Sequence, residues 1–220
     1  MIAKSIRNSV YLLLFLTLSG CFKEDTPIEP VLRNGIIIKH SMYDYQSFYD
    51  LSDDIVHVSA NNRWDLAFEN SKEGWRVRLN YANLKGILHT GTTDFNATAY
   101  TTTGKTWIYD ASSGNPDSTA IGDWRNFDGP DHMVYLIGNY DGIRYKPYRK
   151  LRFIESNDTS YKFAFANIDN SDAAEVTIRK DTACNYTYYS LTLKDTVKIE
   201  PSKKKLGYPV YAIYDNIIHR

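Results

Sequence analysis

Trp75-Arg76-Val77-Arg78-Leu79-Asn80-Tyr81 alternates apolar and polar side chains along its whole length. Successive side chains of a β-strand point to opposite faces of the sheet, so the four apolar residues would pack on one face. Arg76 and Arg78 would then meet water on the other face. This alternation predicts an all-β fold, mostly antiparallel sheet or sandwich, with long loops and little helix. The same period recurs in three later segments, at residues 161–165, 176–178 and 189–193.

The block that precedes this segment, Arg63-Trp64-Asp65-Leu66-Ala67-Phe68, predicts a core strand. With a period of two, Trp64, Leu66 and Phe68 would share one face of that strand. Asp65 and Ala67 would lie on the other face, where we expect Asp65 to pair at the strand edge.

A β-hairpin is predicted around Asn139-Tyr140-Asp141-Gly142, because an Asp-Gly step suits a tight turn with positive φ. Residues 85–131 are instead rich in Gly, Thr, Ser, Asn and Asp, and the Gly114-Asn115-Pro116 step is typical of an exposed loop. Short strands are predicted near residues 94–101 and 106–109. Residues 42–51 carry a helix-like pattern.

The composition describes a neutral, aromatic-rich chain of 220 residues with 18 Tyr and 9 Phe. Aromatic side chains fit half-buried pleated surfaces, which again favours strands. Removal of residues 1–20 would delete Lys4 and Arg7 but no acidic residue, leaving 24 Lys and Arg against 26 Asp and Glu. Because such a domain lacks the electrostatic footprint of a nucleic-acid binder, we expect no nucleic-acid partner. Residues 34–220 have a common size for a single β domain.

The N-terminus has the pattern of a lipoprotein signal peptide. A basic start and a short apolar run precede Leu18-Ser19-Gly20-Cys21, which resembles the acylation site of bacterial lipoproteins. This lipobox predicts cleavage after residue 20 and attachment of acyl chains such as palmitate to Cys21, which would anchor the chain to a membrane. The alternatives are an ordinary secretory peptide with a chance cysteine, or a transmembrane anchor, for which the apolar run is short.

Residues 21–33 are predicted to form a flexible, lipidated tether. Phe22-Lys23-Glu24-Asp25 is similar to the signal that exports lipoproteins of Bacteroidota-type bacteria to the outer face of the outer membrane. We therefore expect a protein that faces the cell surface, while a merely solvated charged tether is the alternative. If Cys21 carries lipid, Cys184 has no disulfide partner and is expected to be a buried or turn thiol.

The central region resembles the HmuY-like haem-binding lipoproteins of Bacteroidota-type bacteria. The resemblance rests on Trp64-Asp65-Leu66-Ala67-Phe68, on Arg76-Val77-Arg78-Leu79-Asn80 with the glycine-containing residues 86–91, and on a hairpin that begins with Val134-Tyr135-Leu136-Ile137 and continues to Lys146. It covers most of residues 43–165. It implies a β-sheet protein that holds haem at one end, in an apolar slot between two axial side chains that are often both histidine.

Both axial histidines that the resemblance implies are missing from their expected places. The family's ligand loop corresponds to Trp124-Arg125-Asn126-Phe127-Asp128-Gly129-Pro130, with Asp128 or no residue at the histidine position. The earlier ligand region, residues 101–118, contains neither His nor Met.

Replacement haem ligands are His132, Met133 and His89. His132 and Met133 would point to opposite faces of a strand, so only one of them could reach the iron. A hydrogen-bonded strand end for His132 and an exposed loop position for His89 are the structural alternatives. Arg76 and Arg78 could pair with haem propionates, or could serve only to solubilise a strand face.

No motif of an enzyme is found, since Gly-x-Ser-x-Gly, His-Glu-x-x-His and a phosphate loop are all absent from the sequence. We therefore expect a non-catalytic protein of the outer membrane whose leading function is haem capture. The alternative is a surface lipoprotein of the same fold that has lost its haem ligands and binds a protein or a glycan.

Overall fold

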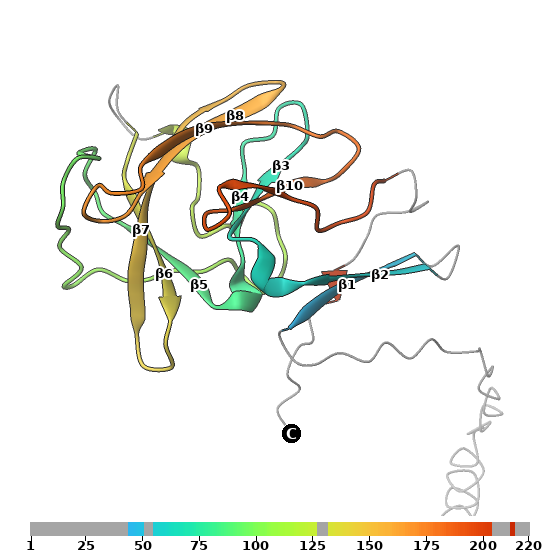
Figure 1. Cartoon of the computed structure of the whole chain (residues 1–220), viewed down its shortest axis with the longest axis horizontal. Coiled ribbons are helices and arrows are strands. Elements are labelled where there is room, and N and C mark those ends of the chain that lie inside the picture. Colours follow the sequence, from blue (N-terminus) through green and yellow to red (C-terminus); the bar gives the residue numbers. More distant parts are fainter. Residues whose placement is uncertain (1–43, 51–54, 127–131, 204–211, 214–220) are drawn as a thin grey trace, which may run out of the picture. The chain divides into compact units, whose positions relative to one another are not determined.

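The computed structural model describes residues 44–50, 55–126, 132–203 and 212–213, all within one compact unit, Ile38–Arg220. Antiparallel strands form three sheets (Figure 1), which confirms the all-β prediction. The predicted signal peptide and tether, residues 1–33, lie outside the described residues. Among the described helices, none is long and apolar enough to cross a membrane. Those helices are short 3-10 turns: η1 (Asn61–Arg63), η2 (Tyr81–Asn83) and η3 (Trp124–Asn126).

A three-stranded sheet has the order β12-β1-β2. Its strands are β1 (Tyr45–Asp50), β2 (Ile55–Ala60) and β12 (Ala212–Ile213). The helix-like pattern of residues 42–51 is misleading, because every residue of β1 has a partner in β2, and the backbone groups of the pair are satisfied across the strands.

The two larger sheets have the orders β11-β10-β3-β4 and β5-β6-β7-β8-β9. The four-stranded sheet contains β3 (Leu66–Glu69), β4 (Val77–Leu79), β10 (Tyr186–Ser190) and β11 (Asp195–Val197). The five-stranded sheet contains β5 (Lys85–His89), β6 (Tyr135–Tyr140), β7 (Tyr145–Ser156), β8 (Ser160–Ala166) and β9 (Ala174–Arg179).

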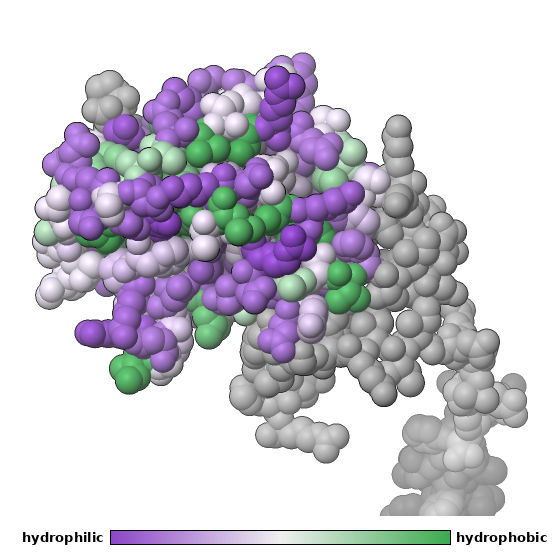
Figure 2. All heavy atoms as spheres, viewed as in Figure 1, coloured by the Kyte–Doolittle hydropathy of each residue, from purple (hydrophilic) through white to green (hydrophobic). Residues whose placement is uncertain are grey.

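The hairpin predicted at Asp141-Gly142 is confirmed, and it joins β6 to β7. One carboxylate oxygen of Asp141 accepts the backbone N–H groups of Ile143 and Arg144, and Gly142 has a φ of +96°, which a side chain would disfavour. Ile143 is 87% exposed, and Figure 2 shows hydrophobic atoms at the tip of this hairpin.

The main hydrophobic core lies between the two larger sheets. Phe68 of β3 packs its ring against Phe153 of β7 and against Tyr161 and Phe163 of β8, at centroid distances of 5.1–6.3 Å. Tyr189 of β10 meets Phe163 edge to face at 5.1 Å. Offset and edge contacts of this kind are the preferred geometry of aromatic pairs. Buried aromatic side chains therefore hold the two larger sheets together.

A second buried cluster contains Trp64, and here the predicted strand face is wrong. Leu66 and Phe68 belong to the main core, but Trp64 packs with Ala67 and with Tyr188, which its ring meets at 4.9 Å. The reason is that β3 begins only at Leu66, since η1 and a bend at Asp65 precede it. The two-residue period therefore does not extend back to Trp64.

The outer face of the five-stranded sheet is covered by the long segment between β5 and β6. The fully buried Nζ of Lys150 on β7 donates to the carbonyl oxygen of Ala97 at 2.9 Å and lies over the rings of Phe95 and Tyr100. These contacts hold the segment against the sheet without a regular strand. Of the short strands predicted there, only a single bridge between Ile108 and Ile87 of β5 forms.

Candidate functional site

Two glycines create a flat floor on the outer face of the five-stranded sheet. Gly86 of β5 and Gly138 of β6 are directly paired. A Cβ atom on Gly86 would lie 2.5 Å from the ring of Tyr145, and one on Gly138 would lie 2.7 Å from the ring of Trp107. Both distances are shorter than a non-bonded contact allows, so the absence of side chains lets the two rings lie directly on the strands.

Five aromatic side chains gather on this floor, and we call them the aromatic surface: Tyr81, Trp107, Tyr109, Tyr140 and Tyr145. Tyr145 stacks on Trp107 at 5.3 Å and contacts Tyr140 at 5.2 Å, while Tyr81 stacks on Tyr109 at 4.8 Å. Burial raises the pKa of Tyr145, and the nearby phenols of the other three tyrosines add to this effect. Tyr81, Tyr109 and Tyr140 are 40%, 51% and 39% exposed, so the surface is open to a ligand.

Asn80 turns the chain out of β4 and delivers Tyr81 to this surface. Its side-chain oxygen accepts the N–H of Asn83, and its amide donates to the carbonyl oxygens of Asn61 and Trp64 at 2.5 and 2.8 Å. The apolar alternation that began at Trp75 therefore ends at Leu79. Tyr81, expected on the buried face, is exposed instead.

Asp110 fixes the position of the backbone next to Tyr109. Its carboxylate accepts the backbone N–H of Leu79 at 2.9 Å and that of Ala120 at 2.8 Å, which ties the long segment to β4. Burial raises the pKa of Asp110 despite these bonds.

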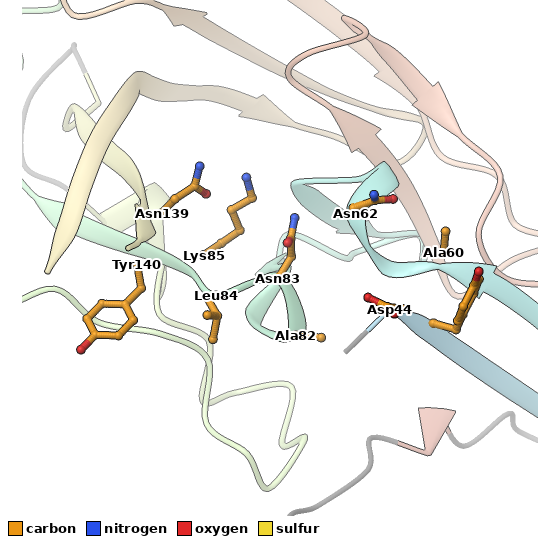
Figure 3. A pocket seen from close by; sticks show the side chains of 10 residues that line it. Asp44, Ala60, Asn62, Ala82, Asn83, Leu84, Lys85, Asn139 and Tyr140 are labelled. Carbon is orange, nitrogen blue, oxygen red and sulfur yellow. The ribbon is translucent and has the colours of Figure 1, made fainter. Parts of the chain in front are cut away.

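A polar pocket of about 590 Å³ lies at the same end of the sheet, and we call it the amide pocket. Figure 3 shows the side chains of Asn83, Lys85 and Asn139 rising on one side of β5 and β6, whereas Tyr140 points the other way. Within the described part of the chain, the side-chain amides of Asn62, Asn83 and Asn139 make no hydrogen bond. The pocket is lined by Asp44, Tyr45, Ala60, Asn62, Ala82, Asn83, Leu84, Lys85, Asn139 and Tyr140.

The ammonium group of Lys85 is already neutralised inside the protein. Its Nζ lies 2.8 Å from Oδ1 of Asp65 and donates to the hydroxyl of Tyr148 at 3.2 Å, and that hydroxyl donates to Asp65 at 3.0 Å. Burial is the main cause that raises the pKa of Tyr148, so its phenol stays protonated. Lys85 therefore offers the pocket its aliphatic stem and no free charge.

Two of the predicted haem ligands have structural roles. Nε2 of His89 lies 2.9 Å from the carbonyl oxygen of Ala120, and its ring meets Tyr135 edge to face at 5.0 Å. Met133 is buried in the main core. In these positions His89 joins the long segment to β5, and Met133 fills the space between the sheets.

His132 has a different environment. Its ring meets Trp124 edge to face at 5.7 Å, and its buried Nδ1 has no hydrogen-bond partner among the described residues. Residues 127–131 of the predicted ligand loop lie outside those residues. Within the described part of the chain, His132 and His89 lie against different aromatic side chains, Trp124 and Tyr135 respectively.

The two arginines predicted to bind propionates are held by the protein itself. Arg76 pairs with Glu69 at 3.2 Å and with Asp117 at 2.5 Å, and Arg78 donates to the carbonyl oxygen of Gly114 at 2.6 Å. They therefore fasten the exposed loop around Gly114 to β4.

Of the two cysteines, Cys184 lies within the described residues. The predicted lipidation site, Cys21, lies outside the described residues. Cys184 is a half-buried free thiol in a turn, where burial raises its pKa to about 11, as the turn-thiol alternative predicted.

No group of three or more His, Cys, Asp or Glu side chains that could hold a metal ion occurs among the described residues. Comparison of the chain with protein-family models, with curated proteins and with solved structures returns no match. The resemblance to the HmuY-like family therefore stays a prediction.

Sequence reasoning missed the aromatic surface and the amide pocket. Their residues come from β1, β2, β5, β6, β7, η1, η2 and the long segment, and nothing in their spacing marks them as neighbours. The available signal was the high number of tyrosines, 18 in the chain.

Proposed function

We propose that this protein is a non-catalytic, lipid-anchored surface protein whose aromatic surface binds a carbohydrate. The observation that carries the proposal is a group of partly exposed tyrosines beside the floor made by Gly86 and Gly138, in which Tyr81 stacks on Tyr109 and Tyr145 stacks on Trp107. A cluster of exposed rings is unusual on a surface that has no partner, since large apolar patches mark binding sites.

The chemistry of the rings favours a sugar over other occupants. A tyrosine ring has an apolar face and a polar hydroxyl, which match the C–H face and the hydroxyl edge of a pyranose. Lys146 and Asp141, on the same hairpin, pair with each other at 2.7 Å. Exposed aliphatic and Arg side chains, which a protein interface would also use, are present at Leu84 and in the turn between Tyr140 and Tyr145, at Ile143 and Arg144.

Isothermal titration of the full chain in detergent with neutral gluco-, manno-, xylo- and galacto-oligosaccharides tests the proposal. Binding to at least one series is expected, and Tyr109→Ala should weaken it by about tenfold, since an aromatic stacking contact contributes up to about 1.5 kcal/mol. Leu193→Ala, which removes an exposed apolar side chain from the turn after β10, is the matched control and should bind as wild type. Wild-type protein that binds none of these sugars, or a Tyr109→Ala variant that binds normally, would overturn the proposal.

A second candidate function is haem capture, which the sequence resemblance implies. Its support is His132, whose buried Nδ1 has no hydrogen-bond partner in the part of the chain that the structure describes, whereas His57 and His89 each bond a backbone carbonyl group. Haemin titration should then give a sharp, shifted Soret band that His132→Ala abolishes or converts to a five-coordinate spectrum. His89→Ala and Met133→Ala should change the band less. A broad, unshifted Soret band in the wild type would contradict haem capture.

A further inference from the structure

We propose that the amide pocket is a second subsite for the same glycan, one that takes a neutral sugar ring through its hydroxyl groups. This inference rests on the proposed carbohydrate function of the aromatic surface. It adds that the ligand is an oligosaccharide and that affinity depends on its length.

The first support is the way two chain segments serve both sites. The turn η2 carries Tyr81 to the aromatic surface and Ala82 and Asn83 to the pocket. At the end of β6, Asn139 faces the pocket side while the next residue, Tyr140, points to the aromatic side (Figure 3). Because Asn139 and Tyr140 are consecutive residues of β6, their side chains leave opposite faces of the strand, and the two sites meet at a rim along this strand end.

Leu84 and Tyr140 form that rim. Both line the pocket, and both are among the exposed large side chains, Leu84 at 44%. Leu84 has a φ of +52°, and its N–H bonds the carbonyl oxygen of Tyr81, so the turn is held in a tight left-handed conformation. An oligosaccharide that stacks on the tyrosines would pass over Leu84 and Tyr140 at this end of the sheet to reach the pocket.

The pocket's polar groups match hydroxyl groups. An Asn side chain has two N–H donors and a carbonyl acceptor, and a sugar hydroxyl both donates and accepts. Three such amides, Asn62, Asn83 and Asn139, have no internal partner among the described residues. Since Lys85 is neutralised by Asp65, nothing in the pocket favours an acidic sugar.

The size of the pocket is also appropriate. Its volume of about 590 Å³ lies within the range of small-molecule sites, about 300–1,000 Å³. It has room for a sugar ring and the waters that commonly bridge hydroxyls to protein.

The test measures affinity against chain length, from monosaccharide to hexasaccharide, for whichever neutral series the full chain binds. Wild-type affinity is expected to rise by about tenfold or more when the oligosaccharide becomes long enough to reach the pocket. Asn83→Ala and Asn139→Ala should each lose most of that gain while they bind the shortest ligands as wild type does. Asn115→Ala, in an exposed loop away from both sites, is the matched control and should keep the gain.

The outcomes separate the two proposals. If the wild type binds no oligosaccharide, the carbohydrate function itself fails, and the subsite fails with it. If the wild type binds but its affinity does not depend on length, or if both Asn variants keep the full gain, the subsite alone is overturned. Matching unfolding temperatures for wild type and variants will show that a loss of affinity is not a loss of fold.

Discussion

Asp65 and Lys85 form a buried ion pair in which Oδ1 lies 2.8 Å from Nζ, and it links the bend before β3 to the first residue of β5. The second oxygen of Asp65 accepts the N–H of Leu191 at 2.8 Å, so one carboxylate joins the ends of β3, β5 and β10. The Trp-Asp step that suggested an edge pairing thus lies at the junction of both large sheets, directly behind the amide pocket.

Asp65→Ala should lower the free energy of unfolding by about 3–5 kcal/mol, because it leaves the ammonium of Lys85 buried without a counter-charge. The pair Lys72 and Asp158, whose side chains are 76% and 61% exposed, is the matched control. Lys72→Ala should cost no more than about 1 kcal/mol. Urea denaturation of the three proteins compares them, and equal losses for the two variants would show that the Asp65 pair is effectively solvated.

Gly86→Ala should destabilise the protein by about 1–3 kcal/mol and disrupt the aromatic surface, since the new Cβ would meet the ring of Tyr145 at 2.5 Å. Tyr145→Ala removes the ring that the new Cβ would meet. The double variant should therefore recover the cost of the clash, and a double-mutant cycle by urea denaturation measures this coupling. Additive effects would show that Tyr145 does not lie on Gly86.

Trp64→Ala should cost about 3–5 kcal/mol, because the indole is only 4% exposed and packs against Tyr188. Trp64→Phe should cost less. It retains most of the buried ring and removes an indole N–H that is buried with no hydrogen-bond partner among the described residues. If guanidinium denaturation ranked the two variants equally, or left Trp64→Ala as stable as wild type, the second buried cluster would contribute little.

Glu200 should make stability fall as pH rises. Burial raises its pKa above the ordinary value of 4.5, although backbone N–H groups of Asn185 and Tyr186 bind its carboxylate. The folded state therefore holds a proton that the unfolded state has already released, and this stabilisation, complete below pH 4.5, is lost as pH rises through the folded pKa.

Glu200→Gln tests this sign, because the glutamine keeps the carbonyl acceptor but never ionises. The variant should gain stability relative to wild type as pH rises from 4 to 7, as measured by unfolding temperature. A difference that stays constant across this interval would show that Glu200 does not titrate with folding.

Cys21→Ala should abolish acylation and leave the chain unprocessed or soluble, since the lipobox cysteine is the predicted anchor. Cys184→Ala is the matched control, because Cys184 lies in a turn of the folded domain. Metabolic labelling with a palmitate analogue and membrane fractionation read out the result. A Cys21→Ala protein that still fractionates as a processed membrane protein without label would refute the lipoprotein prediction.

The class of secondary structure and several local features could be predicted from the sequence. Alternation with a period of two reports which side chains face the same way, and this is a local property of an extended chain. For the same reason the Asp141-Gly142 turn could be predicted, because a carboxylate that caps its own turn and a glycine with positive φ act within four residues. Val77, Arg78 and Leu79 also followed the expected faces of β4.

The positions of the two proposed binding surfaces depend on tertiary packing. Gly86 is opposite Gly138, and Tyr81 stacks on Tyr109, because of strand register and loop packing over separations that no local pattern records. Trp64 does not share a face with Leu66, because the 3-10 turn η1 precedes it and β3 begins only at Leu66. Strand pairing and side-chain packing are many-body choices among distant segments, so the binding surfaces they create emerge only when the sheets are assembled.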